Sequence, residues 1–202
     1  MARAQAGDII VDMKPTFGHC AIVTGNWNMK LSASVGSTGV PGGLGVIHAT
    51  SGGVIAGDWS NGRAYCFRAR RISSEELKVI QEVAEAIQTG GGGGAPSTEY
   101  GACRAIFKSW SAPGKFGTGA RARLDKYRER LGKDRQVLKN VFCSELVIVA
   151  YQLGLKVNEA HEGWIPLDGK HTLPGTLKRW FDANMARWQH MGFVEDASLA
   201  LK

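Results

Sequence analysis

Cys143 stands at the start of the most apolar stretch of the chain, which runs from Phe142 to Gly154. The stretch predicts a buried helix that is apolar nearly all round and that ends at a glycine in a C-terminal cap position. Backbone N–H groups at a helix N-terminus and the helix dipole lower the pKa of a thiol there and can hold an oxyanion. Cys143 is therefore a candidate nucleophile, and the alternative is a buried structural cysteine.

Two histidines lie in segments that are predicted to be strands. His19 falls in residues 18–23 and His48 in residues 46–49. A thiolate nucleophile needs an imidazole within hydrogen-bond reach and a third polar group that orients the imidazole. Each histidine has a simpler interpretation as a strand residue whose ring is satisfied by neighbouring backbone, and for His48 that interpretation is the stronger one.

The four cysteines are far apart in the sequence, at Cys20, Cys66, Cys103 and Cys143. They form no C-x-x-C pair and have none of the spacing of a structural zinc site, so we expect reduced, individual thiols and no bound metal. Because side chains alternate along a strand, Cys20 is expected to point away from His19 into the core. Cys66 and Cys103 are interpreted as structural residues.

Other titratable residues receive no catalytic role. Glu145 lies in the first turn of the predicted nucleophile helix, where a favourable interaction with the helix N-terminus explains it. The histidines His161, His171 and His190 are expected in loop or surface contexts.

The elements that must position these residues begin with a hairpin. Residues 7–11 predict a turn and a buried strand, and residues 18–23 predict its partner. Short strands are also expected at residues 46–49 and at residues 63–71, the latter with one solvated face.

Three further helices are predicted. Ser73 and Glu76 form a capping box ahead of an apolar periodicity that continues to Ile87. Five consecutive glycines at 90–94 are interpreted as a flexible connector. Residues 117–135 predict a basic helix over Leu124, Tyr127 and Leu131, and a last helix begins near Pro174 with Leu177, Trp180, Phe181 and Met185 on its apolar face.

The composition indicates one globular domain spanning residues 1–202, because 44% of the residues are hydrophobic. No window reaches the roughly 18 apolar residues of a membrane helix, and the first residues lack the apolar segment of a secretory signal. We therefore expect a protein made in the cytoplasm without stable membrane insertion. The formal charge of +7 favours polyanionic partners without choosing among them.

Three motifs together resemble the circularly permuted NlpC/P60 hydrolases, the branch that includes YiiX-like proteins and the lecithin:retinol acyltransferase group. Residues 7–10 and 18–23 resemble the family's "GD" and histidine strands, and residues 46–54 resemble the strand that follows. Residues 142–147 closely resemble its "CSELV" nucleophile helix, and residues 171–177 its next segment. The histidine motif before the cysteine motif is the mark of the permutation.

The resemblance implies an α+β fold of the papain type, with a central antiparallel sheet packed on the nucleophile helix. It implies Cys143 as nucleophile, His19 as general base and His48 as the orienting group, a position where YiiX-like members often have glutamate and the acyltransferase group has histidine. Tyr100 corresponds to a family tyrosine near the substrate cleft, although an ordinary half-buried tyrosine is the simpler alternative. No cofactor is implied.

The function implied is a cysteine amidase or endopeptidase that cleaves peptidoglycan stem peptides. A wall-degrading enzyme without a signal is expected to be an endolysin or an antibacterial effector, which a specialised secretion system delivers to the target-cell periplasm and an immunity protein inhibits. One alternative is a lipid-directed thiol acyltransferase or thioesterase. The least favoured is a non-catalytic polyanion binder that uses Arg68, Arg70, Arg71 and residues 121–135; with no recognised nucleic-acid motif, we expect no nucleic-acid partner.

Overall fold

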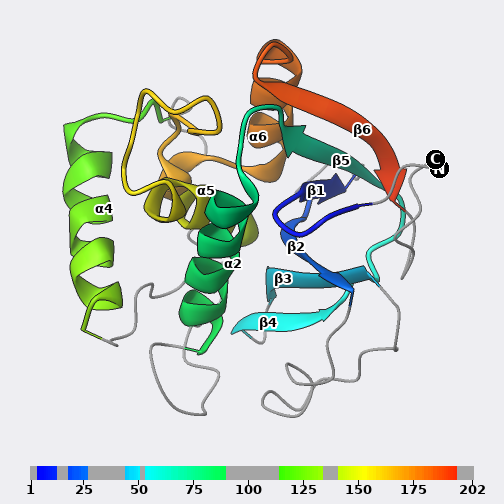
Figure 1. Cartoon of the computed structure of the whole chain (residues 1–202), viewed down its shortest axis with the longest axis horizontal. Helices are drawn as coiled ribbons and strands as arrows, with labels where there is room; N and C mark the ends of the chain where they lie inside the picture. Colours follow the sequence, from blue (N-terminus) through cyan, green and yellow to red (C-terminus); the bar gives the residue numbers. More distant parts are fainter. Residues whose placement is uncertain are drawn as a thin grey trace.

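The computed structural model describes residues 4–12, 18–26, 44–50, 53–89, 114–133 and 141–194. Tyr100, Cys103 and the glycine run at 90–94 lie outside these ranges. Within them the protein is an α+β structure in which one antiparallel sheet packs against a group of helices (Figure 1).

Six strands form the sheet in the order β4-β3-β2-β1-β5-β6, and every neighbouring pair is antiparallel. The first five strands follow one another through the N-terminal part of the chain, while β6 joins the edge beside β5 from the C-terminal part. The strands are β1 (Ile9–Asp12), β2 (Cys20–Asn26), β3 (Leu44–Thr50), β4 (Gly53–Asp58), β5 (Ala64–Ala69) and β6 (Trp188–Val194).

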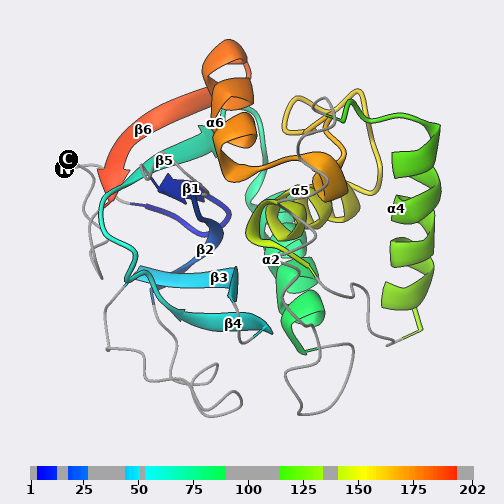
Figure 2. The same ribbon diagram turned by 180° about the vertical axis from the view of Figure 1, so that it is seen from behind.

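The helices gather on one side of the sheet, as the views from the front and from behind both show (Figures 1 and 2). Helix α5 packs against β2, β3 and α2, and α4 lies farthest from the sheet. The helices are α2 (Ser74–Thr89), α4 (Thr118–Leu131), α5 (Cys143–Gly154) and α6 (Pro174–Ala183), with a short 3-10 helix η1 (Gly169–His171).

Alternation along the strands divides the buried side chains between two faces of the sheet. Cys20 and Ile22 of β2 belong to the large core shared with the helices, whereas Ala21 and Val23 belong to a smaller cluster around Trp59. Both faces of the central strands are therefore buried, which explains why β1 and β2 are nearly continuous apolar runs.

The predicted capping box and the predicted buried helix are both confirmed. The Glu76 carboxylate accepts a hydrogen bond from the Ser73 N–H at 2.8 Å, and the Ser73 hydroxyl accepts one from the Glu76 N–H at 3.2 Å. All twelve residues of α5 are buried. The hairpin of β1 and β2 is also confirmed by their antiparallel register.

Gly154 does not cap α5 as predicted. It is the last residue of the helix, and the left-handed conformations that follow belong to Lys156 and Val157, with φ of 54° and 59°. A Cβ atom at Gly154 would lie 2.5 Å from Cγ1 and 2.7 Å from Cα of Ile80. Glycine is required at this position because α2 packs so closely against α5. The two helices are distant in the sequence, so this requirement could not be predicted from local signals.

Two strands and one side chain depart from the sequence-based prediction. Strand β4 was not predicted as a separate element, and β6 was not predicted at all. Met185 was expected on the apolar face of α6, but it lies beyond the end of that helix and is 40% exposed. Helical periodicity therefore extended the predicted helix into the turn that leads to β6.

Candidate active site

The N-terminus of α5 places Cys143 against the sheet. Phe142 is the N-cap residue in an extended conformation, and no side chain caps the helix. The thiol of Cys143 thus lies among the backbone N–H groups that a helix leaves without intrahelical partners. The side chain of Ser144 donates a hydrogen bond to the carbonyl of Thr172, which ties this end of α5 to the segment ahead of α6.

His19 and His48 form a pair on neighbouring segments of the sheet. Because Ile22 pairs with Ile47 in the antiparallel register, Ala21 lies opposite His48, and His19 lies two residues before Ala21 on the same face. His19 Nε2 lies 2.7 Å from His48 Nδ1. His19 was predicted within a strand but lies immediately before Cys20, the first residue of β2.

Trp59 packs against the ring of His19, a contact that the sequence interpretation did not predict. Its ring is fully buried and stacks on the His19 ring with centroids 5.7 Å apart and an interplanar angle of 19°. The indole N–H donates a hydrogen bond of 2.6 Å to the Gly62 carbonyl, which holds the ring in place. A lone tryptophan just after a strand offers no signal that it contacts a histidine forty residues earlier in the chain.

The surroundings of His48 keep its ring neutral. Burial, followed by the positive charge that His19 can carry, lowers the pKa of His48 from 6.5 to about 3. A neutral imidazole has one donor and one acceptor nitrogen, and Nδ1 of His48 is the one that faces His19. Since Nε2 of His19 is engaged with His48, Nδ1 is the His19 nitrogen that remains for a contact with Cys143.

Cys143 contacts both His19 and Cys20. A hydrogen bond from the Cys20 thiol lowers the pKa of Cys143 well below its usual value against the opposing effect of burial. A hydrogen bond and the charge of His19 lower it further, as does a hydrogen bond from the backbone N–H of Cys20. The structure therefore favours a thiolate at Cys143.

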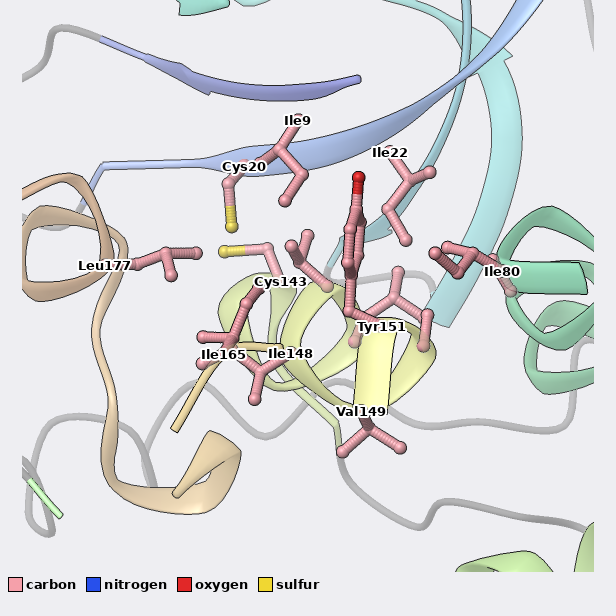
Figure 3. Packing of buried hydrophobic residues seen from close by; sticks show 14 of the residues in the cluster. Ile9, Cys20, Ile22, Ile80, Cys143, Ile148, Val149, Tyr151, Ile165 and Leu177 are labelled. Carbon is pink, nitrogen blue, oxygen red and sulfur yellow. The ribbon is translucent and has the colours of Figure 1, made fainter. Parts of the chain in front are cut away.

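Cys20 is in the core, as expected, but its contact with Cys143 was not foreseen. Figure 3 shows the two sulfur atoms pointing toward each other between β2 and α5. Strand alternation predicted that Cys20 and His19 diverge. Both residues reach Cys143 because His19 lies just outside the regular strand, at the rim of the sheet beside the helix N-terminus.

Glu145 lies in the same helical turn but is engaged elsewhere. The carboxylate is buried, and the Tyr127 hydroxyl of α4 donates a hydrogen bond to it at 3.4 Å. Beside it, Arg123 of α4 forms an ion pair with Asp168. Glu145 thus belongs to the contact between α4, α5 and η1, a role beyond the helix N-terminus interaction that the sequence suggested.

The remaining histidines are not part of this cluster. His161 forms an ion pair with Glu76 at 3.0 Å, and His171 lies 3.8 Å from Asp168. His190 was expected in a loop or at the surface, and it lies half-buried on the edge strand β6, in contact with the rings of Tyr65 and Phe193. The strand β6 itself was not predicted.

Three arginines of the polyanion-binding alternative form polar contacts within the protein. Arg68 forms a bidentate ion pair with the buried Asp8, both N···O distances being 2.7 Å. Arg70 donates to the Met185 carbonyl at 3.0 Å, and Arg71 pairs with Glu162 at 2.7 Å. The guanidinium of Arg68 is therefore already paired with a buried carboxylate.

Within the described ranges, no group of three or more histidine, cysteine or acidic residues is placed to hold a metal ion. None of the helices described is both long enough and apolar enough to cross a membrane. Comparison of the chain with family models, with curated proteins and with solved structures found no match.

Proposed function

We propose that the protein is a papain-type cysteine hydrolase of the permuted NlpC/P60 kind. The observation that carries the proposal is the contact of Cys143, at the N-terminus of α5, with His19, whose other ring nitrogen is 2.7 Å from His48. A nucleophile at a helix N-terminus, a base and an orienting group are the parts that thiol-dependent acyl transfer requires. The resemblance of the sequence motifs assigns the same three residues to the same roles.

The chemistry begins with attack of the Cys143 thiolate on a carbonyl carbon. Negative charge then develops on the carbonyl oxygen, and the N–H groups of the first turn of α5 are donors of the kind that stabilise it. The His19 imidazolium gives its Nδ1 proton to the leaving amine, and a thioester forms at Cys143. Neutral His19 next takes a proton from water, which attacks the thioester and restores the thiolate.

His48 and Trp59 act on His19 and do not contact the scissile bond. The His19 imidazolium donates from Nε2 to the neutral His48, which holds one edge of the His19 ring, and the Trp59 stack holds its plane. Positioning of this kind aligns the proton donor before the reaction, which lowers the entropic cost of the transition state.

Peptidoglycan stem peptides are the proposed substrate, on the strength of the family resemblance. The charge of α4 supports a polyanionic substrate, because five basic residues against two acidic ones leave a net charge of +3 on this helix. Several of these side chains are exposed, and α4 is the helix that lies farthest from the sheet (Figure 1). We further propose delivery to the periplasm of a target cell and inhibition there by an immunity protein.

Digestion of purified peptidoglycan sacculi tests this proposal. Wild type is compared with Cys143→Ala, with His19→Ala and with the control His161→Gln, whose histidine pairs with Glu76 outside the site. Soluble products are separated and identified by mass spectrometry. New muropeptides from wild type and the control, and from neither site variant, support the amidase; equal release by Cys143→Ala contradicts it.

A lipid acyl ester is the second candidate substrate, and one cavity favours it. A cavity of about 570 Å³ has four apolar lining residues, Phe116, Pro166, Leu167 and Trp180, together with Lys115, Thr176 and Arg179. Ile165, next to this wall in the chain, lies beside Cys143 in the core (Figure 3). An apolar cavity with a cation suits an acyl chain attached to an anionic headgroup.

The same variants distinguish the two substrates. Each is incubated with vesicles of an anionic phospholipid, and released fatty acid is measured. Fatty acid release that depends on Cys143, without muropeptide release, assigns the protein to the acyltransferase side of the family. Muropeptides without fatty acid remove the lipid candidate.

A further inference from the structure

The two sulfur atoms at the centre of the site are both free thiols in contact. Cys20 is the first residue of β2 and Cys143 the first of α5, and the Cys20 thiol donates a hydrogen bond to the Cys143 sulfur. Neither residue is in a disulfide. Figure 3 shows the side chains directed at each other, with Leu177 and Ile165 around them.

The two thiols differ in protonation. The pKa of Cys143 is well below its usual value because of the Cys20 and His19 hydrogen bonds, whereas burial and the neighbouring Cys143 raise the pKa of Cys20. A thiolate reacts with oxidants and a neighbouring protonated thiol does not, so oxidation should begin at Cys143. Cys20 is then the sulfur within reach of the oxidised atom.

We propose that Cys20 is a resolving thiol, which forms a reversible disulfide with Cys143 after hydrogen peroxide has oxidised Cys143. The assignment of this bond as an inactive state of the enzyme rests on the proposed function, since it occupies the nucleophile. The formation of the bond itself depends only on the contact between the two sulfurs.

The reaction balances in two steps. The Cys143 thiolate attacks one peroxide oxygen, the O–O bond breaks, and a sulfenic acid forms while the other oxygen leaves as water after taking up a proton. The Cys20 sulfur, which loses its proton, then attacks the sulfenic sulfur, the S–O bond breaks, and a second water leaves. The two sulfurs are oxidised together by two electrons, and the peroxide is reduced to two waters.

A resolving thiol protects the nucleophile. A sulfenic acid without a neighbouring thiol is oxidised further to sulfinic acid, which thiol reductants do not reverse. Cys66 offers no such reaction with Cys143, because it lies in the cluster on the other face of the sheet and donates a hydrogen bond to Asp8 at 3.6 Å. It is therefore the matched control for a buried cysteine outside the site.

Peptide mapping without reductant tests the proposal. Wild type, Cys20→Ala and Cys66→Ala are treated with an equimolar amount of hydrogen peroxide, blocked with an alkylating agent, digested and analysed by mass spectrometry. Wild type and Cys66→Ala should yield a peptide pair joined through Cys20 and Cys143 that dithiothreitol separates. Cys20→Ala should instead gain oxygen atoms on the Cys143 peptide, part of which dithiothreitol does not remove.

Oxygen addition at Cys143 in wild type without the joined peptides overturns the resolving role, as does pairing of Cys143 with another cysteine. The wild-type map decides this even if Cys20→Ala folds poorly. If the joined peptides are found but the protein cleaves neither sacculi nor lipid, the disulfide is supported and the proposed hydrolase function is contradicted. Full activity of the disulfide form would contradict only the claim that the disulfide inactivates the enzyme.

Discussion

Nε2 of His19 and Nδ1 of His48 are 2.7 Å apart, although 29 positions separate the two residues in the chain. The antiparallel register of β2 and β3 brings them together. The lowered pKa of His48 keeps its ring neutral, so a His19 ring protonated on both nitrogens, as the proposed mechanism requires, donates from Nε2 to Nδ1 of His48. One end of the His19 ring is thus fixed, and the other is free to act on Cys143.

The His48 hydrogen bond predicts a positioning effect on catalysis. The variant His48→Ala should lower kcat by about two to four orders of magnitude, as loss of an orienting group does in other triads. KM should change little, since His48 does not contact the scissile bond. Steady-state kinetics of wild type, His48→Ala and the control His161→Gln measure the difference; an unchanged kcat in His48→Ala contradicts the role.

The same residue predicts how stability depends on pH. The folded protein holds His48 neutral down to about pH 3, whereas the unfolded chain protonates it near 6.5. Between these values the unfolded state binds more protons, so stability falls as the pH falls, by up to roughly 1.4 kcal/mol per pH unit. Above pH 6.5 His48 contributes no pH dependence.

Urea unfolding of wild type and His48→Gln between pH 7 and pH 4 isolates this contribution. Carboxylates contribute equally to both proteins, so the difference between the two curves reports His48. We expect the variant to lose less stability on acidification than wild type does. Parallel curves would show that His48 is not held neutral.

The ion pair of Asp8 and Arg68 predicts a large loss of stability on mutation. Asp8 is 2% exposed, and Arg68→Met would leave its carboxylate buried without the opposite charge. We expect a loss of about 3 kcal/mol in the free energy of unfolding. The control Arg71→Met removes an exposed pair with Glu162 and should cost less than about 1 kcal/mol. Urea denaturation of both variants measures the contrast, and similar losses would contradict it.

Substitution by alanine should have different effects at two glycines, Gly154, where α5 approaches α2, and Gly132, which follows α4. Gly154→Ala would place a Cβ 2.7 Å from the Ile80 Cα, so the helices must separate, at a cost of about 1 to 3 kcal/mol. At Gly132 the nearest atom would lie 3.7 Å away and the backbone is helical, so Gly132→Ala should be neutral or stabilising by up to about 1 kcal/mol. Thermal unfolding measures both, and a neutral Gly154→Ala would contradict the account.

Local signals made part of this structure predictable. The capping box of Ser73 and Glu76 and the apolar run after Cys143 depend on neighbours within a few residues, and both helices begin where these signals indicate. The β1–β2 hairpin was predictable for the same reason. The family resemblance, which is a pattern of three separated motifs, directed attention to Cys143, His19 and His48, and in the structure His19 contacts each of the other two.

The contacts that were not predicted all join distant segments. Nothing near Trp59 in the sequence indicates that it stacks on His19. The contact depends on the antiparallel pairing of β4 with β3, which brings Trp59, the residue after β4, near His19. The edge strand β6 was missed because its pairing with β5 is set by tertiary packing. Cys20 was assigned correctly to the core, but strand alternation could not show that the core there contains the Cys143 sulfur.

The proposed role of Cys143 as a thiolate nucleophile activated by His19 can be tested by ultraviolet titration of the thiolate. Absorbance is followed from acid to alkaline pH in wild type, Cys143→Ala and His19→Ala. The account predicts a thiolate that forms well below the usual cysteine range in wild type, is absent in Cys143→Ala, and forms at higher pH in His19→Ala. A wild-type Cys143 that ionises only at or above the usual range would contradict it.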